Sequence, residues 1–454
     1  MNNTLVCNIF LSIVVAAGFS VGTEARAQFV NGGFESGAAN IPPPAPWTLT
    51  TYLNPSFTEQ TPETLAALDL ITGGVAKTVT LTSASGPRTQ TDPGLGASAS
   101  LRWPRFGNQC AIVNQQGSSS NVNSLSQTVT IFSGSVDPID GKTHIRFVVA
   151  PVLQNPNHVF SQQPYYFIQV VNITQQTVLY QDLGVSGEQG VPWKSINGGS
   201  PTEIDYTDWQ LVDIAPGNAQ MALGDQVTLK IIASGCSLGA HYGQVYVDGV
   251  GATVPGISVE GTAPASAASN ITYTLSCKNG AASSETGVVI LFNTPSNTTF
   301  QAVNAPGMVN LTPAVGAAGA VACTFPGSLL AGASSSISIT VNINPGTTGT
   351  IVAGNYEIHS TEEPLPLLGP KINTAILPSP PLLSGLTLLG TNFGFSFNDT
   401  PGSSFTVLTS TDVALPSGDW TVAGSMTEGP SGHFTFTDPQ AATNQQRFYR
   451  VRSP

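Results

Sequence analysis

The stretch GQVYVDGVG, residues Gly243–Gly251, alternates apolar with other side chains and is bounded by glycines, which is typical of a β-strand. A second glycine-rich stretch, FVNGGFESG, residues Phe29–Gly37, lies near the start of the chain. We interpret the two stretches as the two ends of one β-sandwich. Several segments between them also alternate and are separated by Gly, Pro, Asn and Asp: SLSQTVTIFSG (124–134), THIRFVVAPV (143–152), YYFIQVVNI (165–173), WQLVDIA (209–215) and QVTLKIIASG (226–235).

The composition favours a folded, strand-rich chain. Of the 454 residues, 41% are hydrophobic and only 9% are charged, with 47 Gly and 34 Pro to punctuate short strands. The hydrophobic content argues against disorder. The net charge is −12, and the 14 Lys and Arg residues do not cluster. Binding to phosphates needs clustered cations, so we expect no nucleic-acid partner.

The first 27 residues resemble a signal peptide. FLSIVVAAGFSVG (10–22) is an apolar run, and Ala25-Arg26-Ala27 is a small-x-small cleavage site before Gln28. The run is short for a membrane-spanning helix, and no later stretch has enough continuous apolar residues. We therefore predict export through a cleaved signal peptide, an extracellular or cell-surface location, and no transmembrane segment in the mature chain.

Three regions follow the leader, and all of them alternate as antiparallel strands do. The first spans residues 28–256, the second 257–378 and the third 379–454, with a Pro-rich run near residue 378 marking the last boundary. No segment is a convincing helix, and the best candidate, TPETLAALDLITGG (61–74) with Thr61 as a possible cap, is expected to give at most one or two turns. The predicted fold is all-β: an N-terminal jelly-roll sandwich followed by two immunoglobulin-like or fibronectin-like β-sandwich modules.

The cysteine count is even once Cys7 is removed with the leader. Four cysteines in an exported chain predict two disulfides, for which three pairings exist. We predict Cys110–Cys236 and Cys277–Cys323, because each pair then falls within one region. Four buried free thiols are the alternative. Metal binding is less favoured, since no C-x-x-C or C-x-x-H spacing occurs.

The first region resembles a galactose-binding-like jelly roll. The resemblance is carried by NGGFESG (31–37), PWTLT (46–50), SLSQTVTI, GKTHIRFVVAP, TDWQLVDI and GQVYVDGV. Such a jelly roll implies adjacent first and last strands, often with a structural calcium between them. Glu35 and Asp248 fall at the matching places, and calcium takes six or more oxygen ligands. A turn at Asn31–Gly33 and a strand-end role for Asp248 are the simpler alternative.

The other two regions resemble modules of bacterial secreted proteins. ITYTLSCKNG (271–280), GVVILFNTPSNTTFQAV (287–303) and CTFPGSLLAGASSSISITVNI (323–343) are similar to the repeated domain of unknown function, number eleven, of bacterial surface proteins. That family implies a spacer or adhesion module without catalytic residues. FGFSFNDTPGSSFTVLTSTD (393–412) and the final RFYRV (447–451) resemble a C-terminal β module of planctomycete and verrucomicrobial secreted proteins.

The sequence argues against an enzyme. GCSLG (235–239) matches G-x-S-x-G, but strands flank it on both sides, so we expect it to join two strands of a hairpin and Ser237 to be inert. The five histidines form no ligand or catalytic spacing. Paired carboxylates need no local motif, so a glycoside hydrolase-like enzyme stays as a weaker alternative.

The candidate ligand residues lie in loops of the first region. Trp103 and Trp193 could stack on sugar rings, with Arg105 and Asn197 supplying hydrogen bonds. Loop anchoring is the alternative role for both tryptophans. We expect a non-catalytic secreted or cell-surface protein whose jelly roll binds a glycan, carried on two spacer sandwiches. A purely structural or adhesive envelope or matrix protein without a small ligand is the second expectation.

Overall fold

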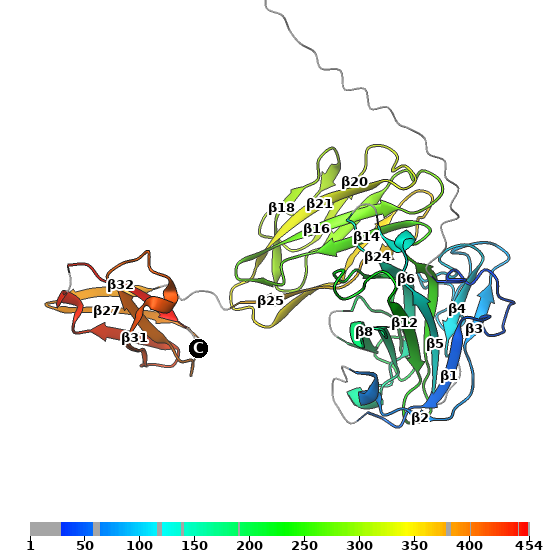
Figure 1. The fold of residues 1–454 in the computed structure, drawn as a ribbon, viewed down its shortest axis with the longest axis horizontal. Coiled ribbons are helices and arrows are strands. Elements are labelled where there is room, and N and C mark those ends of the chain that lie inside the picture. The colour runs from blue at the N-terminus through cyan, green and yellow to red at the C-terminus, as the bar shows by residue number, and fades with distance from the viewer. Residues whose placement is uncertain are drawn as a thin grey trace, which may run out of the picture. The chain divides into compact units, whose positions relative to one another are not determined.

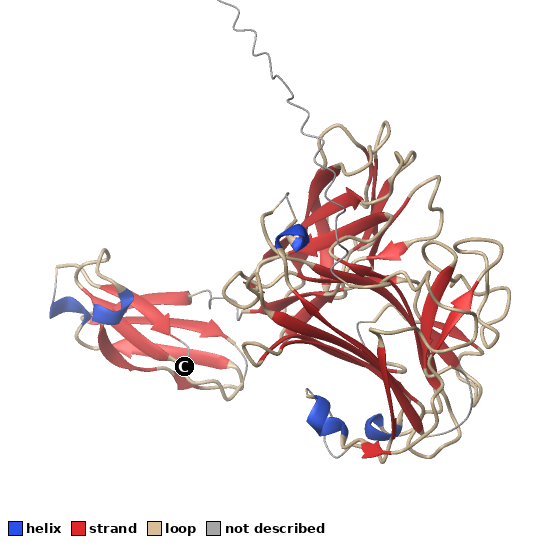
Figure 2. Cartoon of the chain, turned by 45° about the vertical axis from the view of Figure 1, so that its right-hand side comes forward, coloured by secondary structure: helices blue, strands red, loops and turns tan. Residues whose placement is uncertain are grey.

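The computed structural model describes residues 29–57, 64–115, 120–137, 140–188, 191–377, 383–399, 401–443 and 445–452. The predicted signal peptide lies outside these residues. Within them the protein is all-β, as predicted, and its only helical elements are short 3₁₀ turns (Figure 2). These turns are η1 (Leu65–Leu68), η2 (Ser133–Ser135), η3 (Phe160–Gln162), η4 (Ser417–Asp419) and η5 (Ala441–Thr443).

The chain forms two compact units. The larger unit comprises the residues up to Thr374, apart from the short segments Ser266–Ser269 and Gly346–Gly349. The smaller unit comprises those segments and Ala375–Pro454. The first two regions recognised in the sequence therefore lie together in one unit.

The first half of the larger unit is a β-sandwich, which we call the N-terminal sandwich (β1–β13; Figure 1). One of its sheets has the order β2 (Ile71–Thr72), β1 (Thr48–Leu53), β5 (Asn121–Thr130), β12 (Gln226–Ser234), β7 (Tyr165–Asn172) and β8 (Thr177–Val185). The other contains β11 (Gln210–Ile214), β6 (Ile145–Gln154), β13 (Gly243–Gly251), β4 (Gln109–Val113) and β3 (Val79–Thr82), with β10 (Ile204–Tyr206) paired to β6 and β9 (Lys194–Ile196) paired to β10.

Side chains from both sheets fill the interior of this sandwich. Leu125 and Ile231 lie opposite each other in the first sheet, and they share one core cluster with Phe147 and Val245 of the second. All four side chains are fully buried. Each contributes about 1.5–3 kcal/mol to folding relative to an exposed position. The apolar residues of the alternating segments in the sequence therefore form this core.

The two ends of the N-terminal sandwich lie side by side, as expected. The N–H of Val250 in β13 donates a hydrogen bond to the carbonyl of Gly32 at 3.0 Å. A Cβ on Gly32 would lie 1.8 Å from the carbonyl oxygen of Val250, whereas one on Gly33 would meet only ordinary contacts. The first of the two glycines thus permits this close approach. Residues 29–37 form turns rather than the expected first strand.

One local expectation needs correction. GCSLG does not close a hairpin, because β12 and β13 belong to different sheets and the segment crosses between them. The helix candidate over residues 61–74, expected to give at most one or two turns, forms the single turn η1. The hydroxyl of Thr64 caps this turn by accepting a hydrogen bond from the N–H of Ala67, while Thr61 lies outside the described residues.

The second half of the larger unit, here called the middle sandwich (β14–β24), continues the long sheet of the first. At the junction β11 pairs in parallel with β24, with Gln210 opposite Leu368, so the long sheet runs through both sandwiches (Figure 1). Its strands on this side are β24 (Leu367–Leu368), β23 (Tyr356–His359), β17 (Val289–Asn293), β20 (Ala320–Thr324) and β19 (Val309–Leu311). A separate sheet has the order β14 (Ile257–Thr262), β16 (Asn270–Asn279), β21 (Ser334–Ile343) and β18 (Thr298–Asn304). Three further short strands are β15 (Ser266–Ala267), β22 (Thr350–Ala353) and β25 (Ile372–Ile376).

The smaller unit is built around phenylalanines. Phe397 and Phe434 stack at 5.6 Å between ring centroids, and Phe405 meets both rings edge-on at 4.9 Å. One sheet contains β26 (Ser384–Leu389), β27 (Asn392–Asn398), β31 (His433–Asp438) and β30 (Thr427–Glu428), and the other contains β29 (Thr421–Ser425), β28 (Thr406–Ser410) and β32 (Phe448–Arg452).

Candidate functional site

A polar cavity of about 410 Å³ lies between the N-terminal and middle sandwiches. One wall comes from β6 and the loop before it, with Asp137, His144 and Arg146. The facing wall comes from β14, β16 and β21, with Glu260 and Lys278 among its residues. The remaining lining is rich in hydroxyl groups: Thr262, Thr274, Ser276, Ser334, Ser335 and Ser336.

Arg146 joins the two walls. Its Nη1 donates to Asp137 Oδ2 at 3.0 Å and to the carbonyl of Ala252 at 2.8 Å, and its Nε donates to Glu260 Oε1 at 2.7 Å. Lys278 Nζ also donates to Asp137 Oδ2, at 2.8 Å. The side chain of Arg146 is only 3% exposed, so these ion pairs are shielded from solvent. Burial alone lowers the pKa of Arg146, but the surrounding carboxylates outweigh it and raise that pKa.

Glu260 and His144 of this network have shifted pKa values. Burial, followed by repulsion from Asp213, raises the pKa of Glu260 from its ordinary 4.5 to about 7, against the opposing effect of Arg146. His144 lies between two carboxylates, with Nδ1 2.7 Å from Asp213 Oδ1 and Nε2 3.1 Å from Asp140 Oδ2. Burial lowers the pKa of His144, but its hydrogen bonds to Asp213 and Asp140 give a net increase. The site thus combines fixed charges with groups that titrate near neutral pH.

This arrangement suits recognition of a polar ligand better than hydrolysis. Hydroxyl, carboxylate and cationic groups converge on one cavity, and they are the partners that a hydroxyl-rich molecule needs. Asp213 and Glu260 lie within 4.8 Å of each other, yet both contact Arg146 Nε, whose positive charge offsets part of theirs. The carboxylate pair therefore serves as a counter-ion for the buried arginine.

The predicted ligand residues do not line this cavity. The Trp103 ring stacks on Tyr246 with centroids 6.3 Å apart, and its Nε1 donates to the carbonyl of Thr91 at 3.2 Å. Trp193 packs against the core of the N-terminal sandwich. Asn197 is exposed. Both half-buried tryptophans hold their loops through these contacts, and a role of either in ligand binding stays a prediction.

Arg105 connects the two sandwiches. Its side chain is 0% exposed, and its Nη2 donates to Glu363 Oε2 at 2.9 Å. Its Nη1 donates to the carbonyl of Leu365 at 2.8 Å. Since a fully buried guanidinium with these partners is inaccessible, Arg105 has a structural role in place of the expected ligand contact.

Glu35 and Asp248 meet, together with Glu363, at a second cavity of about 380 Å³. Glu35 Oε1 accepts the backbone N–H groups of Asn108 and Gln109 at 2.8 and 3.0 Å. Asp248 Oδ2 accepts the N–H of Phe106 at 2.9 Å, and burial raises the pKa of Asp248 well above its ordinary value. A calcium ion would have to share these oxygens with the N–H donors, so structural calcium stays a prediction.

The predicted disulfides are absent, because all four described cysteines are free and buried. Cys110 lies on β4 and Cys277 on β16, while Cys323 lies on β20. Burial raises the pKa of each of these three thiols, to about 11 for Cys277, so they remain protonated. They pack as small apolar groups. Cys236 instead lies beside a histidine, with Sγ 3.4 Å from His241 Nδ1.

The central residues of the polar cavity were not predicted from the sequence. His144 and Arg146 stand two positions apart in THIRFVVAPV, so they lie on one face of an otherwise apolar strand. Two ionisable groups on one face of such a strand are the signal that could have indicated the site. Their partner Glu260 comes from another sandwich, and no spacing in the sequence links it to them.

Comparisons with known proteins identify no family. No protein-family model and no curated protein matches the chain. Among solved structures, the chain is similar to the C-terminal domain of the Streptococcus pyogenes antigen I/II-family protein AspA, with 11% identity, a TM-score of 0.19, and coverage of 59% of this chain and 96% of that one. It is also similar to the secreted serine protease VesC of Vibrio cholerae, with 9% identity, a TM-score of 0.18, and coverage of 68% and 96%. Red sea bream transglutaminase gives 10% identity, a TM-score of 0.18, and coverage of 59% and 31%. TM-scores this low carry no argument about function.

Within the described ranges, no helix has the length and apolar character needed to cross a bilayer.

Proposed function

We propose that the protein is a non-catalytic, exported surface or matrix protein that binds a hydroxyl-rich ligand, of the glycan class, in the polar cavity between the N-terminal and middle sandwiches. The observation that carries the proposal is the convergence of Arg146, Lys278 and Glu260 with six serine and threonine residues on one cavity of about 410 Å³. Pockets of roughly 300–1,000 Å³ hold small ligands. Export follows from the predicted signal peptide.

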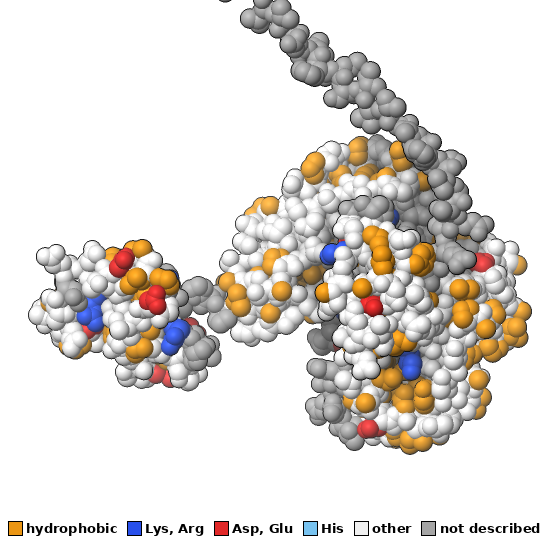
Figure 3. Space-filling model, viewed as in Figure 1, with side chains coloured by type: hydrophobic (Ala, Val, Ile, Leu, Met, Phe, Trp, Pro, Cys, Tyr) orange, Lys and Arg blue, Asp and Glu red, His pale blue; other side chains and the backbone are white. Residues whose placement is uncertain are grey.

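The sparse charge on the face of the protein shown in Figure 3 is compatible with a location outside the cell. Figure 3 shows a face on which charged side chains are sparse and most atoms belong to uncharged polar side chains or backbone. Such a surface offers no cationic stripe for nucleic acid. Binding would therefore depend on local cavities rather than on a general electrostatic field.

A glycan-array screen of the purified mature chain, with and without calcium, tests the proposal. Ser336 lines the cavity and is exposed, so Ser336→Trp should block it while leaving the ion pairs intact. Gln226→Trp is the matched control, since Gln226 is exposed on β12 away from this cavity. Saturable binding that is lost in Ser336→Trp and kept in Gln226→Trp is the expected result.

Two other outcomes would replace the proposal. If the folded protein binds no glycan, a purely structural or adhesive role is the better explanation. Release of reducing sugar from a bound glycan, lost in Glu260→Gln, would instead establish a hydrolase, because the raised pKa of Glu260 suits a general acid. A calcium-dependent rise in the melting temperature, lost in Glu35→Gln, would support the predicted calcium site.

A further inference from the structure

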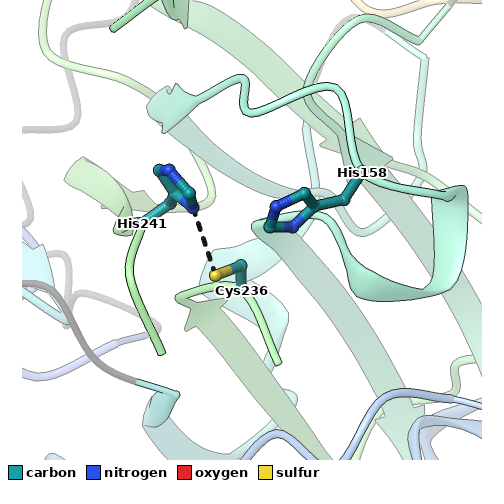
Figure 4. A group of neighbouring side chains, drawn as sticks. All are labelled: His158, Cys236 and His241. Atoms are coloured by element: carbon teal, nitrogen blue, oxygen red, sulfur yellow. Dashed lines mark hydrogen bonds between the residues drawn. The ribbon is translucent and has the colours of Figure 1, made fainter. Parts of the chain in front are cut away.

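Three potential metal ligands from distant parts of the chain meet at one end of the N-terminal sandwich. His158 lies in the loop between β6 and η3, whereas Cys236 and His241 lie in the segment that connects β12 to β13. Figure 4 shows the two imidazole rings and the thiol directed toward one another. This cluster is separate from the polar cavity, which none of the three residues lines.

The distances match those of a metal centre. Cys236 Sγ lies 3.4 Å from His241 Nδ1, and the two imidazole rings are 5.2 Å apart with an interplanar angle of 77°. One ligand atom from each residue lies within 4.8 Å of the other two. Tetrahedral zinc, with Zn–S of about 2.3 Å and Zn–N of about 2.0–2.1 Å, places its sulfur and nitrogen ligands about 3.6 Å apart. Small rotations of the side chains therefore suffice to close the site.

The histidines are available as ligands. His158 Nδ1 is buried and has no hydrogen-bond partner among the residues that the structure describes. His241 Nδ1 is directed at Cys236 Sγ, 3.4 Å away. Imidazole nitrogen is the commonest metal ligand in proteins. A buried nitrogen without a partner is costly, and a bound ion would satisfy it.

The backbone holds the two ligands of the connecting segment in place. The N–H of Cys236 donates to the carbonyl of His241 at 2.9 Å, and the N–H of Gly239 donates to the carbonyl of Cys236 at 3.0 Å. The N–H of Ser237 donates to the carbonyl of Gln162 at 3.3 Å, which connects this segment to the loop carrying His158. The ligands are therefore positioned by backbone contacts before any ion binds.

A catalytic thiolate–imidazolium pair explains the cluster less well. Such a pair needs only two of the three side chains that meet here. A second histidine adds nothing to a two-residue nucleophile but completes a three-ligand set. Thiolate and imidazole are ligands that zinc accepts, whereas calcium and magnesium prefer oxygen.

We propose that His158, Cys236 and His241 bind one zinc ion, with a fourth coordination position open to water or an external ligand. The ion connects the loop before η3 to the β12–β13 segment. Binding displaces the thiol proton of Cys236 to solvent, so affinity falls as the pH is lowered. The proposal is independent of the ligand proposed for the polar cavity.

The test uses the full mature chain, stripped of metal with a chelator in the presence of a phosphine reductant. Zinc is titrated against a chromophoric competitor, and cobalt(II) serves as a spectroscopic probe of tetrahedral thiolate coordination. We expect one equivalent of zinc, a cobalt spectrum with a thiolate charge-transfer band, and no competition by calcium. His158→Asn and His241→Asn should each weaken binding by at least about 100-fold, because even outer-shell partners of a metal ligand are worth 10–100-fold.

Matched variants keep the proposal falsifiable. Cys236→Ser should abolish the charge-transfer band. Because Cys236 is buried, this variant could fail to fold, and His158→Asn then provides the test, since His158 is a half-buried loop residue whose replacement should not disturb folding. His359→Asn, a half-buried histidine on β23, is the control and should bind as the wild type does. Failure of the wild type to bind zinc, or unchanged affinity in both His158→Asn and His241→Asn, would overturn the assignment.

Discussion

Replacing Arg105 by methionine tests whether the two sandwiches of the larger unit are held together by a buried ion pair. The guanidinium is fully buried and lies 2.9 Å from Glu363 Oε2, with the carbonyl of Leu365 as a further acceptor. Methionine keeps the apolar stem and removes the charge. Glu363 then remains as a buried carboxylate, 3.9 Å from the remaining cation Arg88.

The expected loss follows from removal of the nearest cation of Glu363. Removing one partner of a buried ion pair costs about 3–5 kcal/mol. Because Arg88 still lies 3.9 Å from Glu363 and offsets part of its charge, we expect the lower end of that range, about 3 kcal/mol. The larger unit exceeds the 150–250 residues for which 1 kcal/mol shifts the melting temperature by about 2–4 °C, so this loss corresponds to a fall of roughly 4–5 °C. The transition of the smaller unit should not move, since Arg105 and Glu363 both belong to the larger one.

A double-mutant cycle measured by urea unfolding isolates the pair. Glu363→Gln alone should also destabilise the larger unit, since it leaves Arg105 buried without its carboxylate. The double variant should lose less than the sum of the two single losses, by about 1–3 kcal/mol. Lys142→Met is the control for loss of a positive charge, because Lys142 is exposed, and it should stay within about 0.5 kcal/mol of the wild type. A loss below 1 kcal/mol for Arg105→Met, or single-variant losses that simply add, would refute the reasoning.

Two further predictions concern close packing and pH. Gly32→Ala places a Cβ 1.8 Å from the carbonyl oxygen of Val250 and should lower the free energy of unfolding by about 2–3 kcal/mol or more. Gly33→Ala meets only ordinary contacts and should lower it by less than about 1 kcal/mol. Equal melting temperatures of the two variants would contradict this prediction. The folded-state pKa of Glu260, about 7, lies above its ordinary 4.5, so its stabilising effect is complete below pH 4.5 and is lost as the pH rises through 7. Glu260→Gln removes this pH dependence. As the pH rises from 4.5 to 8, the unfolding free energy of the variant should therefore increase relative to that of the wild type by up to about 3 kcal/mol. Urea-unfolding stabilities of the two proteins that change in parallel with pH would contradict the prediction.

The strands were predictable because their signal is local. QVTLKIIAS predicts a strand with one apolar face, and Val227, Leu229 and Ile231 do point into the core. The nearness of Gly32 to the last strand was also expected, although Phe29–Gly37 forms turns. The strand pattern is set by neighbouring residues, whereas the contact between Gly32 and β13 was expected only because the resemblance to a jelly roll implies adjacent ends.

The candidate sites were not predictable, because they depend on distances between remote segments. An even cysteine count predicted disulfides, yet Cys236 lies beside His241 and His158. Six strands, β7 to β12, separate His158 from Cys236 along the chain. A search for short ligand spacings therefore could not detect the cluster, and only the C-x-x-x-x-H segment gives a local signal.

The polar cavity shows why alternation alone misplaces charged residues in this chain. Arg146 stands between the core residues Ile145 and Phe147, and Asp213 stands between Val212 and Ile214. Alternation therefore assigns both charged side chains to the outer face of the N-terminal sandwich, where an isolated domain would leave them in water. The middle sandwich covers that face instead, and Glu260 of β14 contacts Arg146 there. A residue that the sequence assigns to solvent thus becomes a buried ion-pair partner. The N-terminal sandwich alone would expose both this network and Arg105, so ligand binding should be measured on the larger unit as a whole.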